Sequence, residues 1–173
     1  MDFLLELLKL IIPAGAVLYG MYLVVVSFLS KEREKLLVDL KSESTQVVLP
    51  IRLQAAERLC LLLERISPTQ LLRRANPSQL SAEELHLQLL SDIREEFNHN
   101  ASQQVYFTQD TWNAVKVAVE EVSSLIHLSR QSVEADASGL DLAKVIFSHA
   151  FDRTTDPIQI ALCKVKAEVS LYF

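Results

Sequence analysis

The sequence predicts an all-α protein with one N-terminal transmembrane helix followed by a soluble bundle of about five helices. Three observations lead to this fold class. Leu10–Leu29 is an uncharged apolar stretch, and later segments repeat apolar residues at helical spacing. The 173 residues include only three Gly and five Pro, too few for the tight turns of a β-sandwich or barrel.

The stretch Leu10–Leu29 has the length of a membrane span. At a rise of ~1.5 Å per residue, such a helix covers about 30 Å, the thickness of the hydrocarbon core of a bilayer. A cleaved signal peptide is disfavoured because the leader carries Asp2 and Glu6 and no A-x-A cleavage site follows. A buried core helix is disfavoured by the charged residues at both ends. We therefore expect a retained anchor.

Basic residues on either side of this stretch predict its orientation. Lys31, Arg33, Lys35 and Lys41 follow it, whereas Lys9 alone precedes it. The positive-inside rule then places the C-terminal domain in the cytoplasm.

One face of the predicted span differs from the others. Residues at i, i+4 spacing place Ala16 and Gly20 together as a small-xxx-small pair, which lets a second helix approach closely. We expect this face to pack against another membrane helix, and the alternative is an anchor that packs against nothing. The whole candidate face comprises Ile12, Ala16, Tyr19, Gly20, Leu23 and Ser27.

We expect three regions along the chain. Residues 1–30 form the N-terminal tail and the transmembrane helix. Residues 31–46 form a juxtamembrane helix that ends in a hinge at Ser42–Gln46, where the sequence reads SESTQ. Residues 47–173 form the cytoplasmic helical bundle.

The first half of the bundle contains two long predicted helices. Pro50–Ile66 carries an apolar stripe, and a short helix or turn follows at Thr69–Ala75. Ser81 opens the helix Ala82–Phe97 with a capping box, because a Glu lies three residues later. Gln104–Phe107 is compatible with an extended segment, although a lone short strand has nothing to pair with.

The second half of the bundle contains three predicted helices. Thr108 or Asp110 caps a helix with a seam-like apolar stripe. Leu140–Phe151 is apolar nearly all round, so we expect it to be buried on several sides. Asp156 opens the last helix, and the apolar end Leu171–Phe173 is expected to dock on the bundle.

Charge excludes one class of partner and indicates others. The net charge of −5 argues against nucleic-acid binding. Basic residues outnumber acidic ones by nine to six over residues 31–74, whereas acidic residues dominate from residue 75 onward, fourteen to seven. The basic candidates for contact with a lipid headgroup or an acidic partner are Lys31, Arg33, Lys35, Arg65, Arg73 and Arg74.

The histidines offer a weak metal pattern. Glu83-x-x-His86 and Glu96-x-x-His99 match the pairs of carboxylate-bridged di-iron bundles, which need such pairs on facing helices. Here both pairs lie on one predicted helix and on opposite faces, and His99 is expected beyond the helix end. We therefore predict no metal site and no cofactor.

No other residue pattern identifies a catalytic site. His149 precedes Asp152 by three residues, which is more typical of a surface pair than of catalysis. Cys60 and Cys163 are expected in the core as free thiols, which fits a reducing compartment. The sequence has no phosphate-binding loop, no H-E-x-x-H and no G-x-S-x-G. We predict that the chain is not an enzyme.

The sequence LPIRLQAAERL at Leu49–Leu59, continued by ERISP at Glu64–Pro68, resembles a family of uncharacterised bacterial single-span membrane proteins with a helical cytoplasmic domain. The resemblance implies a location in the bacterial inner membrane and implies no activity.

These observations lead to one main functional hypothesis. We expect a membrane-anchored, non-enzymatic interaction or assembly protein whose cytoplasmic helical domain binds a protein partner or a second copy. An accessory or regulatory subunit of a larger transport, respiratory or secretion complex is the first alternative. A membrane-associated enzyme whose site is assembled from distant residues is the second.

Overall fold

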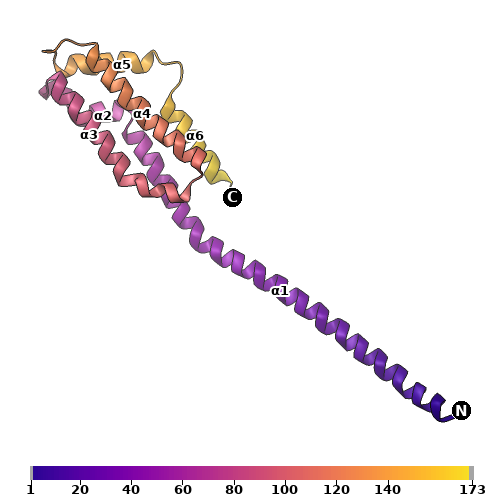
Figure 1. Ribbon diagram of the computed structural model, residues 1–173. Coiled ribbons are helices and arrows are strands. Elements are labelled where there is room, and N and C mark those ends of the chain that lie inside the picture. Colours follow the sequence, from indigo (N-terminus) through magenta and orange to yellow (C-terminus); the bar gives the residue numbers. More distant parts are fainter. Residues whose placement is uncertain (1, 172–173) are drawn as a thin grey trace. The chain divides into compact units, whose positions relative to one another are not determined.

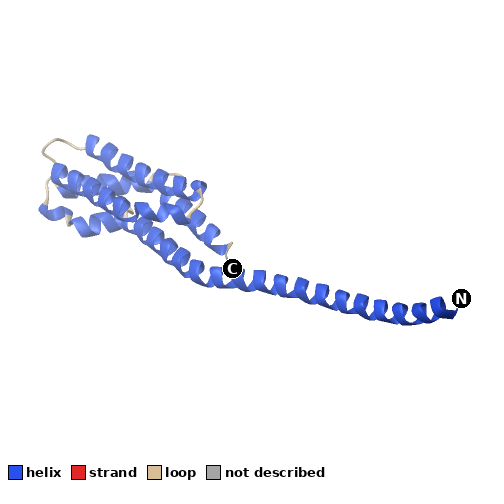
Figure 2. Ribbon diagram, turned by 60° about the horizontal axis from the view of Figure 1, so that its bottom comes forward, coloured by secondary structure: helices blue, strands red, loops and turns tan. Residues whose placement is uncertain are grey.

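The computed structural model describes the backbone of residues 2–171 and the side chains of residues 15, 17–32 and 46–171. This part of the chain is helical, with loops between helices and no strand, which confirms the all-α class (Figures 1 and 2). Its elements are α1 (Asp2–Arg65), α2 (Pro68–Ala75), the 3₁₀ helix η1 (Pro77–Gln79), α3 (Ala82–Asn100), the 3₁₀ helix η2 (Ala101–Tyr106), α4 (Gln109–Gln131), α5 (Gly139–Phe151) and α6 (Pro157–Ser170).

The chain divides into two units, Met1–Val48 and Leu49–Phe173, and α1 contributes residues to both. The stretch Leu10–Leu29 lies within α1. The helix also continues through Ser42–Gln46, where we expected a hinge, because Ser, Glu, Thr and Gln are all tolerated in a helix interior. The unit boundary falls just before Pro50, which has no N–H to donate to the preceding turn.

Within the part of the chain that the structure describes, no helix is both long enough and apolar enough to cross a membrane. The side chains of residues 10–14 and of Ala16, which belong to the predicted span, lie outside the described part.

The second unit is a helical bundle built around α4. This helix packs against α3, α5 and α6, and α3 also packs against α2 and α5. The last turns of α1 enter the same core through Leu59, Leu62, Leu63 and Ile66, all of which are buried. Trp112 of α4 is buried as well and stacks on Phe97, with ring centroids 5.6 Å apart.

Side-chain caps start four of the helices, and the sequence indicated three of them. Ser81 and Glu84 form the predicted capping box at α3. Thr108 caps α4, and Asp156 caps α6 by accepting from the N–H groups of its first turn. Ser138 caps α5 in the same way. Each cap satisfies backbone donors that a helix start leaves unpaired.

The starts of α3 and α5 are joined backbone to backbone. Ser81 and Ser138, their two N-cap residues, form an isolated antiparallel bridge. The Gly139 N–H donates to the Leu80 carbonyl at 2.8 Å, and the Ala82 N–H donates to the Ala137 carbonyl at 3.0 Å. A Cβ at Gly139 would lie 2.5 Å from the Pro77 oxygen, so this approach requires glycine.

A buried carboxylate joins the end of α6 to the start of α4. Glu168 accepts the Thr108 backbone N–H and the Thr108 hydroxyl, each at 2.8 Å. Glu168 is 7% exposed, and these two charge-assisted hydrogen bonds offset part of the cost of its burial.

One alternative about the bundle is decided and two expectations are wrong. Gln104–Phe107, for which an extended form was left open, is not extended, because η2 covers most of it. Helix α5 is buried on one side only and exposes Leu140, Phe147 and Phe151, the last to 90%. Leu171 is 82% exposed instead of docked, and the two residues after it lie outside the described part.

Candidate functional site

The candidate face for packing against another membrane helix is only partly described. The side chains of Ile12 and Ala16 lie outside the described part, whereas those of Tyr19, Leu23 and Ser27 are exposed on α1. A Cβ added at Gly20 would meet no atom within 4 Å. The surface around Gly20 is therefore open to a neighbour from another molecule.

The structure brings two of the predicted basic residues together around a carboxylate. Glu96 of α3 lies 2.8 Å from Arg65 and 3.5 Å from Arg74, and Arg74 also donates to the Arg65 carbonyl. Burial raises the pKa of nearby Asp92 above its usual value, although Arg74 opposes this shift. The local positive charge is thus partly neutralised within the bundle.

Arg73, another of the predicted basic residues, has a partner outside this cluster. Arg73 donates to Gln70 of its own helix at 2.6 Å. Lys31 belongs to the first unit, and the side chains of Arg33 and Lys35 lie outside the described part. Of the six basic candidates, Arg65 and Arg74 are therefore the two that the described residues place around one carboxylate.

The two Glu-x-x-His pairs behave differently from each other. Glu96 is engaged by arginines, and His99 is exposed inside α3 instead of lying beyond its end as we expected. Glu83 lies 2.9 Å from Arg130 of α4 and 3.9 Å from His86 Nδ1. The two pairs do not converge on one site.

His86 has a second histidine as its neighbour. Its Nε2 lies 3.0 Å from Nδ1 of His127 on α4, and the rings meet edge to face. Burial lowers the pKa of His86 below its usual value, and His127 and Arg130 lower it further. Sequence reasoning missed this pair because contact depends on how α3 and α4 are rotated about their axes, which no local pattern encodes.

His149 and Asp152 do not form the pair that we considered. His149 Nδ1 lies 3.0 Å from the hydroxyl of Ser129 on α4. That hydroxyl is buried and donates its proton to the Leu125 carbonyl, so it accepts the hydrogen bond from the imidazole. A Ser-His contact of this polarity holds α4 and α5 together and does not activate a nucleophile.

The cysteines have different environments. Cys60 packs against the core, and burial raises the pKa of its thiol above the ordinary value despite nearby Lys166. The thiol is therefore mostly protonated at neutral pH, which makes it a poor nucleophile. Cys163 is exposed, which corrects our expectation that it lies in the core.

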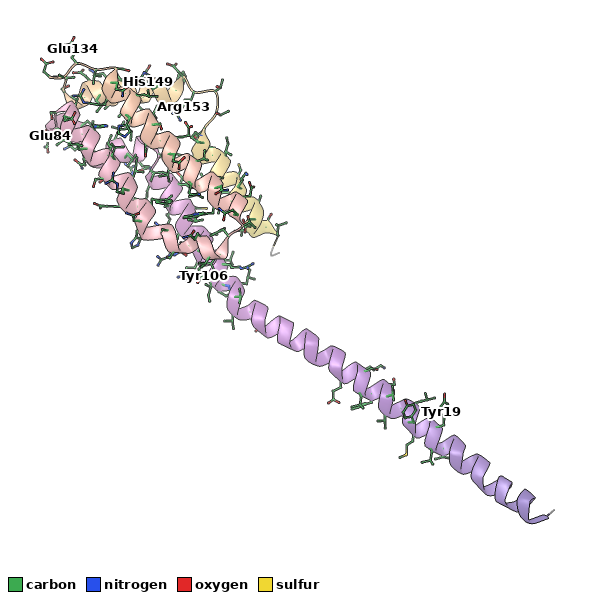
Figure 3. All side chains as sticks on the ribbon, viewed as in Figure 1. Tyr19, Glu84, Tyr106, Glu134, His149 and Arg153 are labelled. Atoms are coloured by element: carbon green, nitrogen blue, oxygen red, sulfur yellow. The ribbon has the colours of Figure 1, made fainter. Side chains whose placement is uncertain are left out.

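A cavity of about 240 Å³ lies at one end of the bundle, between the start of α2, the start of α6 and the last turns of α5. Its lining is mixed: apolar side chains such as Leu125, Phe147 and Ile158 make up about half of it, and polar or charged side chains make up the rest. Arg153 at its edge is engaged by Glu121 at 3.1 Å. His149 and Arg153 lie at this end of the bundle, and Tyr106 lies at the other (Figure 3). Among the described residues, the lining contains carboxylates and hydroxyls, from Glu64, Asp156 and Ser67 among others, but no histidine or cysteine.

The described side chains include no group of three or more His, Cys, Asp or Glu residues arranged to share a metal ion. A family model matches residues 2–172, and the family that it describes has no known function. No curated protein and no solved structure matches the chain.

Proposed function

The chain belongs to that family, DUF7935, and because the family's function is unknown we propose one from the residues themselves. In this proposal the chain is a membrane-anchored, non-enzymatic interaction protein. Its N-terminal stretch spans the inner membrane once, and the bundle Leu49–Phe173 binds a protein partner in the cytoplasm.

The exposure of large apolar side chains in the first unit carries the proposal. A continuous apolar surface of this kind is rare on a protein in water, and lipid or another membrane helix would cover it. Seven of these side chains fall within the uncharged stretch Leu10–Leu29, and each of the seven is between 62% and 68% exposed. They are Val17, Leu18, Tyr19, Met21, Tyr22, Val24 and Phe28.

The bundle offers a second uncovered apolar surface. Leu140, Phe147 and Phe151 recur at i, i+7 and i+11 on α5, so they share one face of that helix. Aromatic side chains dominate the energetics of many protein interfaces. This face is where we expect the protein partner to bind.

The anchor is tested by adding charge to the stretch. Replacing Val17 and Val24 by Lys places two charges at the centre of the proposed span, where each costs about 2.5–3.5 kcal/mol. We expect the variant to leave the membrane fraction, with its bundle still folded by tryptophan fluorescence. Val105→Lys is the matched control, because Val105 is 74% exposed on η2, outside the stretch. An unchanged membrane fraction for the double variant would refute the anchor.

The interaction surface is tested by photo-crosslinking in intact membranes. A photoreactive residue at Phe151 is expected to give a discrete protein adduct, and the same residue at Leu87, an exposed position on α3, is expected to give none. The absence of an adduct from Phe151 would count against a partner at α5.

One observation favours a related alternative, in which the chain is an accessory subunit of a larger membrane complex. The open surface at Gly20, next to Tyr19, would accept a helix of another subunit. Gly20→Ile would then abolish co-purification of that subunit while the chain stays in the membrane fraction. Unaltered recovery would exclude this contact.

A further inference from the structure

His86 of α3 and His127 of α4 contact each other through their imidazole rings. Nε2 of His86 and Nδ1 of His127 are 3.0 Å apart, and the ring planes are 67° apart. His86 is largely buried between α3 and α4, whereas His127 is exposed. One side of the pair is therefore open to solvent.

The spacing of the two nitrogens is that of neighbouring ligands on one metal ion. Metal–imidazole bonds of about 2.0–2.1 Å place two such nitrogens roughly 3.0–3.4 Å apart. In the present contact one nitrogen carries the hydrogen that the other accepts. Small ring rotations would direct both lone pairs at a metal, and the proton would move to a ring nitrogen that faces away from it. Both rings then stay neutral, as imidazole ligands must.

In His86 the ring nitrogen that faces away from His127 is Nδ1, which can carry the proton when Nε2 binds a metal. This Nδ1 is buried and has no hydrogen-bond partner within the described part of the chain. The nearest carboxylate oxygen, on Glu83, lies 3.9 Å away, and Arg130 holds the other oxygen of Glu83 at 2.9 Å. Metal-bound histidines usually donate their second N–H to a carboxylate, and Glu83 is placed for this role after a small shift.

We propose that His86 and His127 bind a divalent transition-metal ion between α3 and α4, with Glu83 as a positioning residue. Water completes the coordination on the side of His127. Two imidazoles favour ions of the zinc, nickel and copper class over magnesium or calcium. The bound ion would link α3 to α4 and stabilise the packing of these two helices.

The test is a Zn²⁺ titration of the full chain in detergent, without a histidine tag. Cys60→Ala and Cys163→Ala are present in every sample, so that thiols do not compete for the metal. Calorimetry is expected to show one saturable site per chain, and Zn²⁺ is expected to raise the unfolding midpoint. His86→Gln and His127→Gln should each weaken binding at least ~10-fold, and Glu83→Gln should weaken it by a smaller factor.

The matched control is His99→Gln, because His99 is an exposed histidine on the same helix as His86. Its affinity for Zn²⁺ should equal that of the parent. Unchanged tryptophan fluorescence would show that each variant is folded. The proposal is overturned if the parent shows no saturable site, or if His86→Gln binds Zn²⁺ as tightly as the parent. Equal affinity in Glu83→Gln would overturn the role given to that carboxylate.

Discussion

The substitution Gly139→Ala tests the backbone bridge between the starts of α3 and α5. The added Cβ would lie 2.5 Å from the Pro77 oxygen and 2.7 Å from the Leu80 oxygen. Both neighbours are backbone atoms, which cannot rotate away as a side chain would. Helix α5 must therefore move away from the loop that precedes α3.

The cost of this movement has two parts. Relief of the overlap costs about 1–3 kcal/mol, the usual range for overpacking. The movement also stretches the hydrogen bonds from Gly139 to Leu80 and from Ala82 to Ala137, each worth about 1 kcal/mol. Alanine regains at most ~1 kcal/mol through its higher helix propensity. We expect a net loss of about 2–4 kcal/mol in the free energy of unfolding.

Tryptophan fluorescence measures this loss for the bundle alone. Trp112 is the single tryptophan of the chain, and it is buried in the second unit against Phe97. Its emission therefore follows unfolding of the bundle without a contribution from the N-terminal part of α1. The expected loss lowers the thermal midpoint by roughly 10 °C for a domain of this size.

A second glycine of the chain is a matched control. A Cβ at Gly15 would meet no atom within 4 Å, and Gly15 belongs to the first unit. Gly15→Ala should leave the fluorescence transition unchanged. If Gly139→Ala also left the midpoint unchanged, the loop would be able to yield at no cost, and the argument from close approach would be refuted.

Three further predictions concern the core, the buried carboxylate and the caps. Leu85→Ala should lower the free energy of unfolding by about 2–5 kcal/mol in urea titrations, whereas Leu87→Ala, on the exposed side of the same helix, should change it by less than ~0.5 kcal/mol. Glu168→Ala should cost about 1–3 kcal/mol in the same titration, because it leaves a partly buried backbone N–H without its acceptor. Hydrogen bonds from the N-cap serines hold the pKa values of Glu84 and Asp141 below their ordinary values, so their contribution to stability is present at neutral pH and lost as pH falls through those lowered pKa values. The urea concentration at the unfolding midpoint should therefore fall when the pH is lowered below about 4. In the double variant Glu84→Gln/Asp141→Asn this midpoint should fall less steeply with pH. An equally steep fall in the parent and the variant would contradict this assignment.

Local chemistry explains which features of the fold were predictable. The Ser81 capping box was predicted correctly, and Thr108 was one of the two residues proposed to cap α4, because each cap depends on residues within one helical turn. Apolar periodicity also located the buried side of the main helices. The end of α3 was placed too early because Asn100 donates to the Glu96 carbonyl and extends the last turn.

Burial and long-range contacts were harder to predict. Helix α5 is apolar nearly all round, but its neighbours cover only the side that carries Leu142 and Ile146, so Phe151 stays exposed. The contact of His86 with His127 joins residues 41 positions apart, and no periodicity links them. The candidate site therefore depends on helix packing, which the sequence pattern does not specify.

The contact of Glu168 with Thr108 has a consequence for synthesis of the chain on the ribosome. The start of α4 is completed by a carboxylate that is translated sixty positions later. Until α6 has left the ribosome, the Thr108 N–H can be satisfied only by water, and the side of α4 that packs on α6 has no cover. A chain that stalls before α6 emerges would therefore expose an apolar surface prone to aggregation.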